Sequence, residues 1–127
     1  MSRQARLEPG ELQHLNAHAT STPAGDESEL GAIGALFGRS RSIAVSATKS
    51  ATGHLLGAAG GLEAIFTILA LRDQVAPPTL NFENPDPGAD GIDIVSGSAR
   101  PMQIRHAISN GFGFGGVNAS VIFRRMD

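Results

Sequence analysis

Two histidines and the only lysine of the chain stand in short segments that could do chemistry on a carbonyl group. His18 opens the polar, proline-terminated segment 18–23, and Lys49 precedes His54 at the start of a glycine-rich stretch. Imidazole N–H groups and an ammonium group can both stabilise negative charge that develops on oxygen. These three side chains are therefore candidates for an oxyanion-stabilising site.

The rest of the chain is organised around the stretch 48–72. Between residues 55 and 71 only Glu63 and Thr67 carry polar side chains. A helix that is apolar all round has to be covered on every side. The stretch therefore predicts a long helix in the interior of the fold.

His54 is predicted to lie in the first turn of this helix, with Thr52 as its N-cap. The partial positive charge of a helix N-terminus disfavours the imidazolium form. We therefore expect a neutral His54 that donates a hydrogen bond to an oxyanion.

Two other interpretations of this stretch fit less well. A membrane span needs about 20 apolar residues, whereas this run is shorter and has Glu63 near its middle. A phosphate-binding loop places lysine after its last glycine, whereas Lys49 precedes the glycines. Small residues at 57–61 let backbones approach closely, which accounts for the glycines but not for Lys49 and His54.

Composition narrows the classes of function. The 127 residues are 41% hydrophobic and 17% charged, which suits one soluble domain. The formal net charge is −2 and the positive residues are scattered, so neither a nucleic-acid partner nor a membrane is expected. The chain has no cysteine, and therefore no disulfide, thiolate metal site or thiol nucleophile. Residues 1–15 do not resemble a secretory signal, so the cytoplasm is the expected compartment.

Hydrophobic periodicity and turn residues predict an α/β fold with a mixed sheet and a buried central helix. Leu30, Ile33 and Leu36 stand at helical spacing in the segment that Gly38 ends. A chain of this size rarely encloses a helix, so another chain or an absent N-terminal half is expected to cover it. The predicted elements are the end of a helix at 1–6, a turn at 8–11, a strand at 13–17, a helix from about 26 to 37, a strand at 42–47, the long helix, a loop at 76–90, and strands at 92–95, 105–109 and 117–124.

The candidate functional residues lie in three loops at strand ends: the segment 18–23, the segment 48–54 and the glycine-phenylalanine run 110–116. Binding sites in such sheets lie beyond the carboxyl ends of the strands. Phe112 and Phe114 stand between glycines, whose backbone freedom would allow a phenylalanine to act as a gate.

The histidines and the lysine also have simpler interpretations than an oxyanion-stabilising site. A zinc site built from His18 and His54 would need a third ligand, for which the sequence offers no usual spacing. Lys49 is predicted to be partly buried and paired with Asp26 and Glu29. Structural or surface roles are expected for the remaining histidines, His14 and His106.

Three segments, NAHATSTPAGDESE, TKSATGHLLGAAGGLEA and SNGFGFGGVNAS, resemble the signature segments of the C-terminal half of β-ketoacyl-acyl-carrier-protein synthases. These are type II elongating condensing enzymes with a thiolase-like fold. The resemblance extends from about Leu7 to Arg124. It implies that residues 1–127 form the C-terminal half of a thiolase-like fold.

The resemblance also implies roles for individual residues. His18 and His54 match the two histidines that bind the malonyl thioester carbonyl and stabilise the enolate formed on decarboxylation. Lys49 matches the lysine that supports these histidines and pairs with acidic residues matching Asp26 and Glu29. In this family the nucleophile is a cysteine of the N-terminal half, which this chain does not contain.

Further matches lie around the histidines. Thr20 and Thr22 match threonines that bind the phosphopantetheine arm. Phe114 matches a gating phenylalanine whose backbone N–H contributes to an oxyanion hole, with Phe112 beside it. Ala19 departs from the family pattern, because many members have glycine there.

Glu63 matches a buried glutamate that, together with other polar residues, surrounds a structural water or cation in some members. The residues that match those other polar residues are Asn16, Ser109 and Asn110. Val117 is a second departure, at a position where many members have threonine.

The implied activity is decarboxylative Claisen condensation of an acyl-enzyme with malonyl-carrier protein in fatty-acid elongation. No cofactor of its own is implied, because the carrier protein brings the phosphopantetheine arm. The expected partners are acyl carrier protein bearing an acyl or malonyl thioester, and either a homo-oligomer or the missing N-terminal half. Two other hypotheses are a catalytically incomplete fragment that binds carrier protein or a full-length synthase, and a residual malonyl-thioester decarboxylase.

Overall fold

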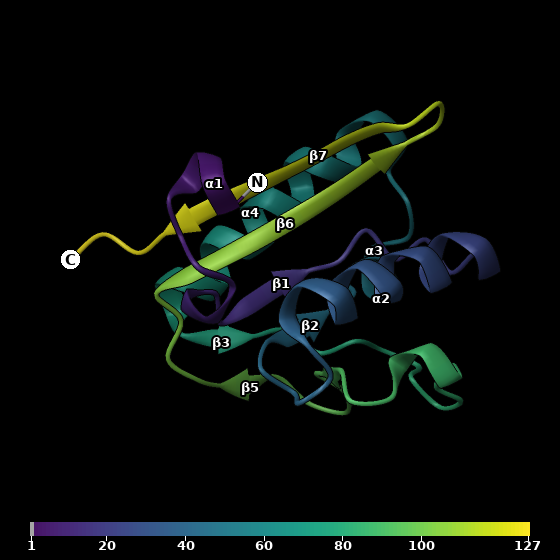
Figure 1. The fold of residues 1–127 in the computed structure, drawn as a ribbon, viewed down its shortest axis with the longest axis horizontal. Helices are drawn as coiled ribbons and strands as arrows, with labels where there is room; N and C mark the ends of the chain where they lie inside the picture. The colour runs from purple at the N-terminus through teal and green to yellow at the C-terminus, as the bar shows by residue number, and fades with distance from the viewer. Residues whose placement is uncertain (1) are drawn as a thin grey trace.

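A five-stranded sheet with a long helix on each face dominates residues 2–127, the part of the chain that the computed structural model describes (Figure 1). The helices are α1 (Ser2–Ala5), α2 (Pro23–Phe37), α3 (Lys49–Thr52) and α4 (Ala59–Asp73), with 3₁₀ turns η1 (Pro9–Glu11), η2 (Leu56–Ala58) and η3 (Pro87–Ala89). The strands are β1 (His14–Asn16), β2 (Ala44–Ser46), β3 (Val75–Ala76), β4 (Asp93–Ile94), β5 (Arg100–Pro101), β6 (His106–Gly113) and β7 (Val117–Arg124).

The sheet is mixed, with the strand order β4-β2-β1-β6-β7. The neighbours β4, β2, β1 and β6 run parallel, whereas β6 and β7 form an antiparallel hairpin. The short strands β3 and β5 make a separate antiparallel pair. The predicted α/β fold with a mixed sheet is confirmed.

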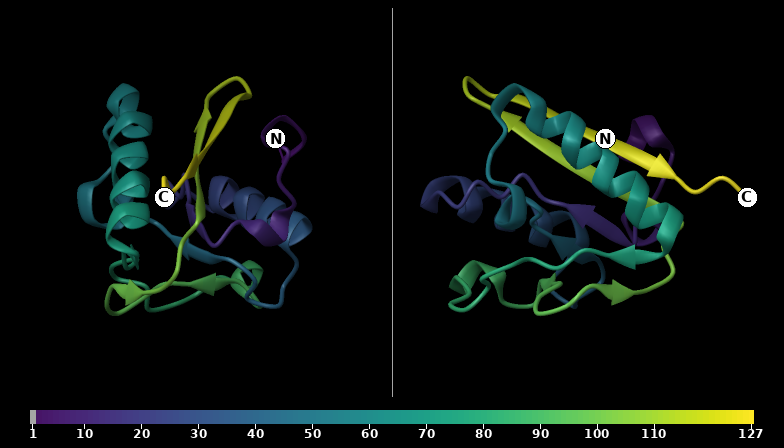
Figure 2. Two further views of the ribbon diagram at one scale, coloured as in Figure 1. Left: turned by 90° about the vertical axis from the view of Figure 1, so that its left-hand side faces the viewer. Right: turned by 180° about the vertical axis from the view of Figure 1, so that it is seen from behind.

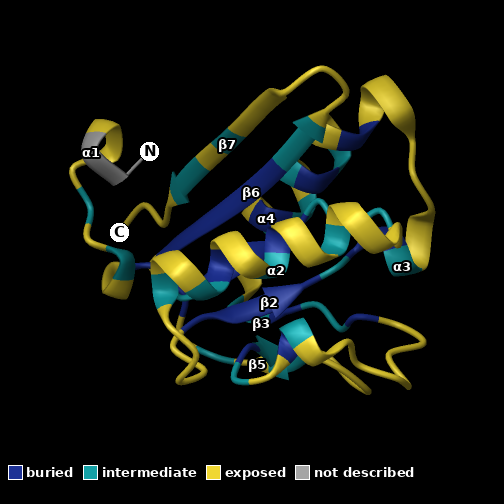
Figure 3. Cartoon of the chain, turned by 45° about the vertical axis from the view of Figure 1, so that its right-hand side comes forward, coloured by how far each residue is buried: buried dark blue, intermediate teal, exposed yellow. Residues whose placement is uncertain are grey.

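The two long helices cover opposite faces of the sheet, as the left view of Figure 2 shows. On the α2 face Leu15, Ile33 and Val45 belong to one buried apolar cluster. Leu36, which shares the helical spacing of Leu30 and Ile33, is 45% exposed, whereas Phe37 packs against the cluster. Figure 3 shows the alternation of buried and exposed residues along α2.

The α4 helix is buried on one side only. Glu63, Thr67 and Ala70 are buried, whereas Ile65 and Ile68 are 53% and 46% exposed. This chain therefore does not enclose its most apolar helix, in agreement with the expectation from its size. None of the helices formed by residues 2–127 has the length and apolar character needed to cross a membrane.

The long helix starts later than predicted. Thr52 does not cap it but ends α3, because Gly53 adopts a φ of 72° and its N–H donates to the Lys49 carbonyl. His54 follows this break, before η2, and so lies outside the first turn of α4. The prediction that His54 lies in the first turn of the long helix is therefore wrong.

The glycine-phenylalanine run is mostly strand rather than loop. β6 continues from His106 through Gly113 and pairs with β7 along its full length. Only residues 114–116 form the turn, where Gly115 and Gly116 have φ angles of 78° and 79°. These left-handed conformations explain why glycine occupies both positions.

Candidate active site

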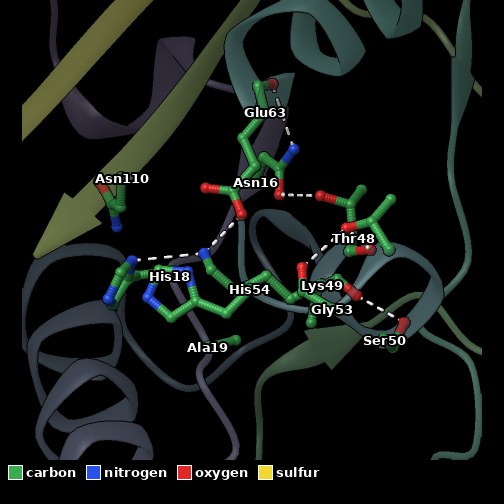
Figure 4. Close-up of polar contacts among 12 residues, drawn as sticks. Asn16, His18, Ala19, Thr48, Lys49, Ser50, Gly53, His54, Glu63 and Asn110 are labelled. Atoms are coloured by element: carbon green, nitrogen blue, oxygen red, sulfur yellow. Dashed lines mark hydrogen bonds and ion pairs between the residues drawn. The ribbon is translucent and has the colours of Figure 1, made fainter. Parts of the chain in front are cut away.

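The candidate site lies beyond the carboxyl ends of two adjacent parallel strands. His18 follows β1, and Lys49 follows β2 at the start of α3. Because the ends of β1 and β2 lie side by side, residues far apart in the sequence meet there. Figure 4 shows His18, His54 and Lys49 together at this edge, as the sequence predicted.

Lys49 is the charged centre of the site. It is 7% exposed and forms an ion pair with Glu63 of α4, which is 3% exposed. Its Nζ also lies 3.3 Å from Nδ1 of His18. The prediction that Lys49 pairs with Asp26 and Glu29 is wrong, since its carboxylate partner comes from the buried face of α4.

The hydrogen bonds define which nitrogen of each histidine carries the proton. A lysine ammonium can only donate, so Nδ1 of His18 accepts from Lys49. The backbone N–H of Leu56 donates to Nδ1 of His54 at 3.1 Å. Nε2 is therefore the nitrogen that carries the N–H in both rings. The ring centroids lie 5.6 Å apart and the rings are perpendicular.

The surroundings of His18 favour a neutral ring. Burial lowers the pKa of His18 below its usual value, and the positive charge of Lys49 lowers it further. Glu29 and Asp26 act in the opposite direction on this pKa, but they do not reverse the shift. The site thus keeps an uncharged N–H donor beside a buried cation.

Glu29 holds the loop that carries His18. Its two carboxylate oxygens accept hydrogen bonds from the backbone N–H groups of His18 and Ala19 at 2.9 and 2.8 Å. Asp26 accepts from the N–H of Ser21 at 3.2 Å, and burial raises the pKa of Asp26, with Glu29 adding to the shift. Asp26 and Glu29 of α2 therefore hold the loop in place and do not pair with the lysine.

The backbone of the loop that carries His18 is strained at Ala19. Ala19 has a φ of 35°, a left-handed conformation that costs an L-residue roughly 1–2 kcal/mol. We expect Ala19→Gly to raise the free energy of unfolding by up to about 1 kcal/mol, because the strain relieved exceeds the added chain entropy. Urea denaturation measures this change. Ala17→Gly, at a buried position outside the left-handed region, should instead destabilise, and a loss in Ala19→Gly would contradict the strain.

The hairpin contributes Asn110 to the site through contacts that the sequence analysis missed. Ser120 Oγ donates to Asn110 Oδ1 at 2.7 Å, and Asn110 Nδ2 donates to Glu29 at 3.0 Å. Asn110 and Ser120 are paired residues of β6 and β7. Recognising the glycine run as a tight hairpin turn could have shown that they lie opposite each other.

The two phenylalanines have different surroundings. Phe112 packs edge-on against His18, with ring centroids 5.6 Å apart. Phe114 lies in the hairpin turn and is fully exposed. Phe112 therefore contacts His18, and the predicted gating role of Phe114 stays a prediction.

Two of the residues suggested to surround a cation or water, Asn16 and Asn110, have hydrogen-bond partners within the chain. Asn16 Oδ1 accepts from Thr48 Oγ1, and Asn16 Nδ2 donates to the Glu63 carbonyl. Asn110 is turned toward Glu29, while Ser109 is buried on the same strand. Over residues 2–127 no three His, Asp or Glu side chains are grouped as a metal site.

A pocket of about 500 Å³ adjoins the site. Thr20 lines it, and the hydroxyl oxygen of Thr22 lies 3.0 Å from that of Thr20. Its polar end includes Lys49 and His54, whereas Leu30 of α2 and Phe82 of the proline-rich loop contribute apolar walls. The pocket is large enough for part of a small-molecule substrate.

The remaining histidines have other partners. His14 is fully buried in β1, and its Nε2 lies 2.9 Å from Ser46 Oγ. Since Ser46 donates its proton to the Pro77 carbonyl, Nε2 of His14 must be the donor to Ser46. His106 Nδ1 lies 3.0 Å from the Glu11 carbonyl. Neither ring has a hydrogen-bond contact with the candidate site, in agreement with the structural roles predicted for them.

Comparison with known proteins identifies the family. A family model described as "Beta-ketoacyl synthase, C-terminal domain" matches residues 1–83 of the chain. The chain belongs to the β-ketoacyl synthase family. This ketoacyl synthase domain is 50% identical over 125 residues to "3-oxoacyl-[acyl-carrier-protein] synthase 2" of Coxiella burnetii. The match covers 98% of the chain but 30% of that relative, so the chain spans less than a third of its length.

Solved structures agree with this assignment. A β-ketoacyl synthase from Burkholderia phymatum superposes with a TM-score of 0.94 at 40% identity, covering 99% of this chain and 30% of that one. A type II PKS ketosynthase in complex with its acyl-carrier protein gives a TM-score of 0.93 at 31% identity, covering 99% and 31% of the two chains. The predicted C-terminal half of a thiolase-like fold is confirmed.

Proposed function

We propose that this ketoacyl synthase domain supplies the two-histidine, malonyl-decarboxylating part of a decarboxylative condensing enzyme. The observation that carries the proposal is the pairing of His18 and His54, which each have Nδ1 occupied as an acceptor and Nε2–H free to donate. Rings this close can both reach a single thioester oxygen placed between them.

The proposed chemistry begins with the malonyl thioester. The bond between its carboxylate carbon and Cα breaks, carbon dioxide leaves, and the electron pair forms an enolate. The negative charge on the enolate oxygen is stabilised by the Nε2–H groups of His18 and His54, while the nearby Lys49 charge adds to the favourable field. The enolate carbon then attacks an acyl thioester, and a carbon–carbon bond forms as the thiolate leaves.

The thiol that holds the acyl group attacked by the enolate must come from outside this chain, which has no cysteine. The family pattern implies a cysteine from the N-terminal half. Acyl carrier protein is the proposed substrate-bearing partner, supported by the related ketosynthase whose structure contains one. No cofactor is required by the proposal, since the carrier protein would bring the phosphopantetheine arm to Thr20 and Thr22.

The test is to supply the missing half. Co-expression with the cysteine-containing N-terminal part of a related synthase should yield condensation of acyl and malonyl thioesters, measured as β-ketoacyl product. His18→Ala and His54→Ala should each lower its rate by about 10²–10⁴-fold, whereas His106→Ala should leave it nearly unchanged. A complemented protein that is assembled but inactive, or that tolerates both substitutions, would refute the proposal.

A binding role without catalysis is the second candidate, favoured by the exposed apolar face of α4 and by the missing nucleophile. It predicts measurable affinity of the chain alone for malonyl-carrier protein or for a full-length synthase. Residual decarboxylation by the chain alone is a third outcome, and it should require His54 but not His106. Calorimetric titration and an assay of released carbon dioxide separate these possibilities.

A further inference from the structure

The β6–β7 hairpin reaches His18 by two routes on the face of the sheet that α2 covers. Asn110 and Phe112 are two positions apart on β6, so their side chains point to the same face. Phe112 packs against the His18 ring. Asn110 Nδ2 donates to Glu29 Oε1, the oxygen that also accepts from the His18 N–H. The hairpin therefore contacts the ring of His18 directly and its backbone through one carboxylate oxygen.

The hydrogen bonds of this network converge on Glu29. Both oxygens of its carboxylate accept from backbone N–H groups, and a carboxylate can only accept. Asn110 must therefore turn its amide NH₂ group to Glu29 and its carbonyl to Ser120, the residue paired with it across the hairpin. The Ser120 hydroxyl, 2.7 Å from Asn110 Oδ1, supplies the donor for that carbonyl. Ser120 thus orients the amide that holds Glu29.

The loop that carries His18 depends on this contact because its backbone is strained. Ala19 has a φ of 35°, and a strained conformation persists only where the surrounding structure holds it. Glu29 supplies the holding contacts, to His18 through Oε1 and to Ala19 through Oε2. A rotation of the carboxylate would lengthen both hydrogen bonds at once. Glu29 and Asn110 are 4% and 7% exposed, so solvent does not readily replace a lost partner of either group.

We propose that Ser120 is a positioning residue for His18 and acts through Asn110 and Glu29. This role rests on the proposed function, in which His18 donates its Nε2–H to the thioester oxygen. Loss of the Ser120 hydroxyl leaves the Asn110 carbonyl without its donor, so the amide can turn and Glu29 is held less firmly. The His18 ring then shifts relative to His54, and a small displacement of a group that binds the reacting atoms lowers the rate.

Backbone NMR signals of the 127-residue chain test the positioning without any catalysis. Ser120→Ala should shift the amide signals of His18 and Ala19, and Ser120→Thr, which keeps a hydroxyl group, should restore both. Val121→Ala alters the next residue of β7, which points to the opposite face of the sheet, and should leave both signals in place. Unchanged signals in Ser120→Ala, or equal shifts in Val121→Ala, would overturn the proposal.

The kinetics of the complemented synthase test the consequence for catalysis. Ser120→Ala should lower kcat for condensation by about 10-fold and leave KM for malonyl-carrier protein nearly unchanged, and Ser120→Thr should recover most of kcat. A purely structural role would instead lower the amount of folded enzyme without lowering kcat per folded molecule. A wild-type kcat in Ser120→Ala, in an enzyme that His18→Ala inactivates, would overturn the proposal. If the complemented wild-type enzyme is inactive, the proposed function fails, and the amide signals alone decide the role of Ser120.

Discussion

Lys49→Met is expected to lower the free energy of unfolding by about 3–5 kcal/mol, because it leaves the buried Glu63 carboxylate without its partner. Burial already raises the pKa of Glu63, and the hydrogen bond from Lys49 opposes that shift. Removing the ammonium group takes away the interaction that makes a carboxylate tolerable inside an apolar helix. Chemical denaturation followed by circular dichroism measures the loss.

Two further variants separate the buried charge from a general loss of packing. Lys49→Met combined with Glu63→Gln should be more stable than Lys49→Met alone, since the glutamine carries no charge. Arg72→Met, which breaks the exposed pair with Asp73, should change stability little. If the double variant loses as much free energy of unfolding as Lys49→Met and Glu63→Gln lose separately when the two losses are added, the two charges are not coupled.

Acid should destabilise this domain through His14. Burial lowers the pKa of His14 from 6.5 to about 4, and its Nδ1 is buried without a hydrogen-bond partner. Between these two pH values the unfolded chain binds a proton that the folded chain does not. The contribution of His14 to stability is therefore complete above pH 6.5 and is lost as the pH is lowered toward 4. The difference corresponds to about 3 kcal/mol lost between pH 7 and pH 4.

Substitutions at and beside His14 show whether this ring is responsible. His14→Phe should flatten the dependence of unfolding free energy on pH between 7 and 5, where few carboxylates titrate. Ser46→Ala should lower stability at every pH, because it removes the acceptor of His14 Nε2–H, but it should keep the slope. An unchanged slope in His14→Phe would show that another group controls the acid response.

The sequence was most informative where short motifs follow buried strands. Alternating apolar residues located β1 and β2, and the rule that sites lie beyond parallel strand ends brought His18 and Lys49 together. It was less informative about the partner of Lys49. Asp26 and Glu29 lie in the same signature segment as His18, whereas Glu63 was predicted only as a buried acid. The Glu29 carboxylate accepts hydrogen bonds from the backbone N–H groups of His18 and Ala19. Side-chain patterns in a sequence do not show such backbone contacts.

The break before α4 illustrates a second limit. The residues from Lys49 to Leu71 contain no proline, and residues 55–71 are apolar apart from Glu63 and Thr67. Two backbone torsions end this continuity: Gly53 has a φ of 72° and Leu56 a φ of 52°. The positive φ of Leu56 is unfavourable for a leucine, so local preference alone does not predict it. The resulting turn lets the Leu56 N–H reach His54, which defines the donor nitrogen of that ring.

The central claim is that His18 and His54 each present an Nε2–H group at the same site. Nitrogen-15 NMR of histidine-labelled protein at neutral pH tests it directly, because protonated and unprotonated ring nitrogens have distinct chemical shifts. Both rings should carry the proton on Nε2 and none on Nδ1, and the His18 signals should change in Lys49→Met. A proton on Nδ1 of either ring would contradict this claim, because that ring could not donate from Nε2 to a shared oxygen.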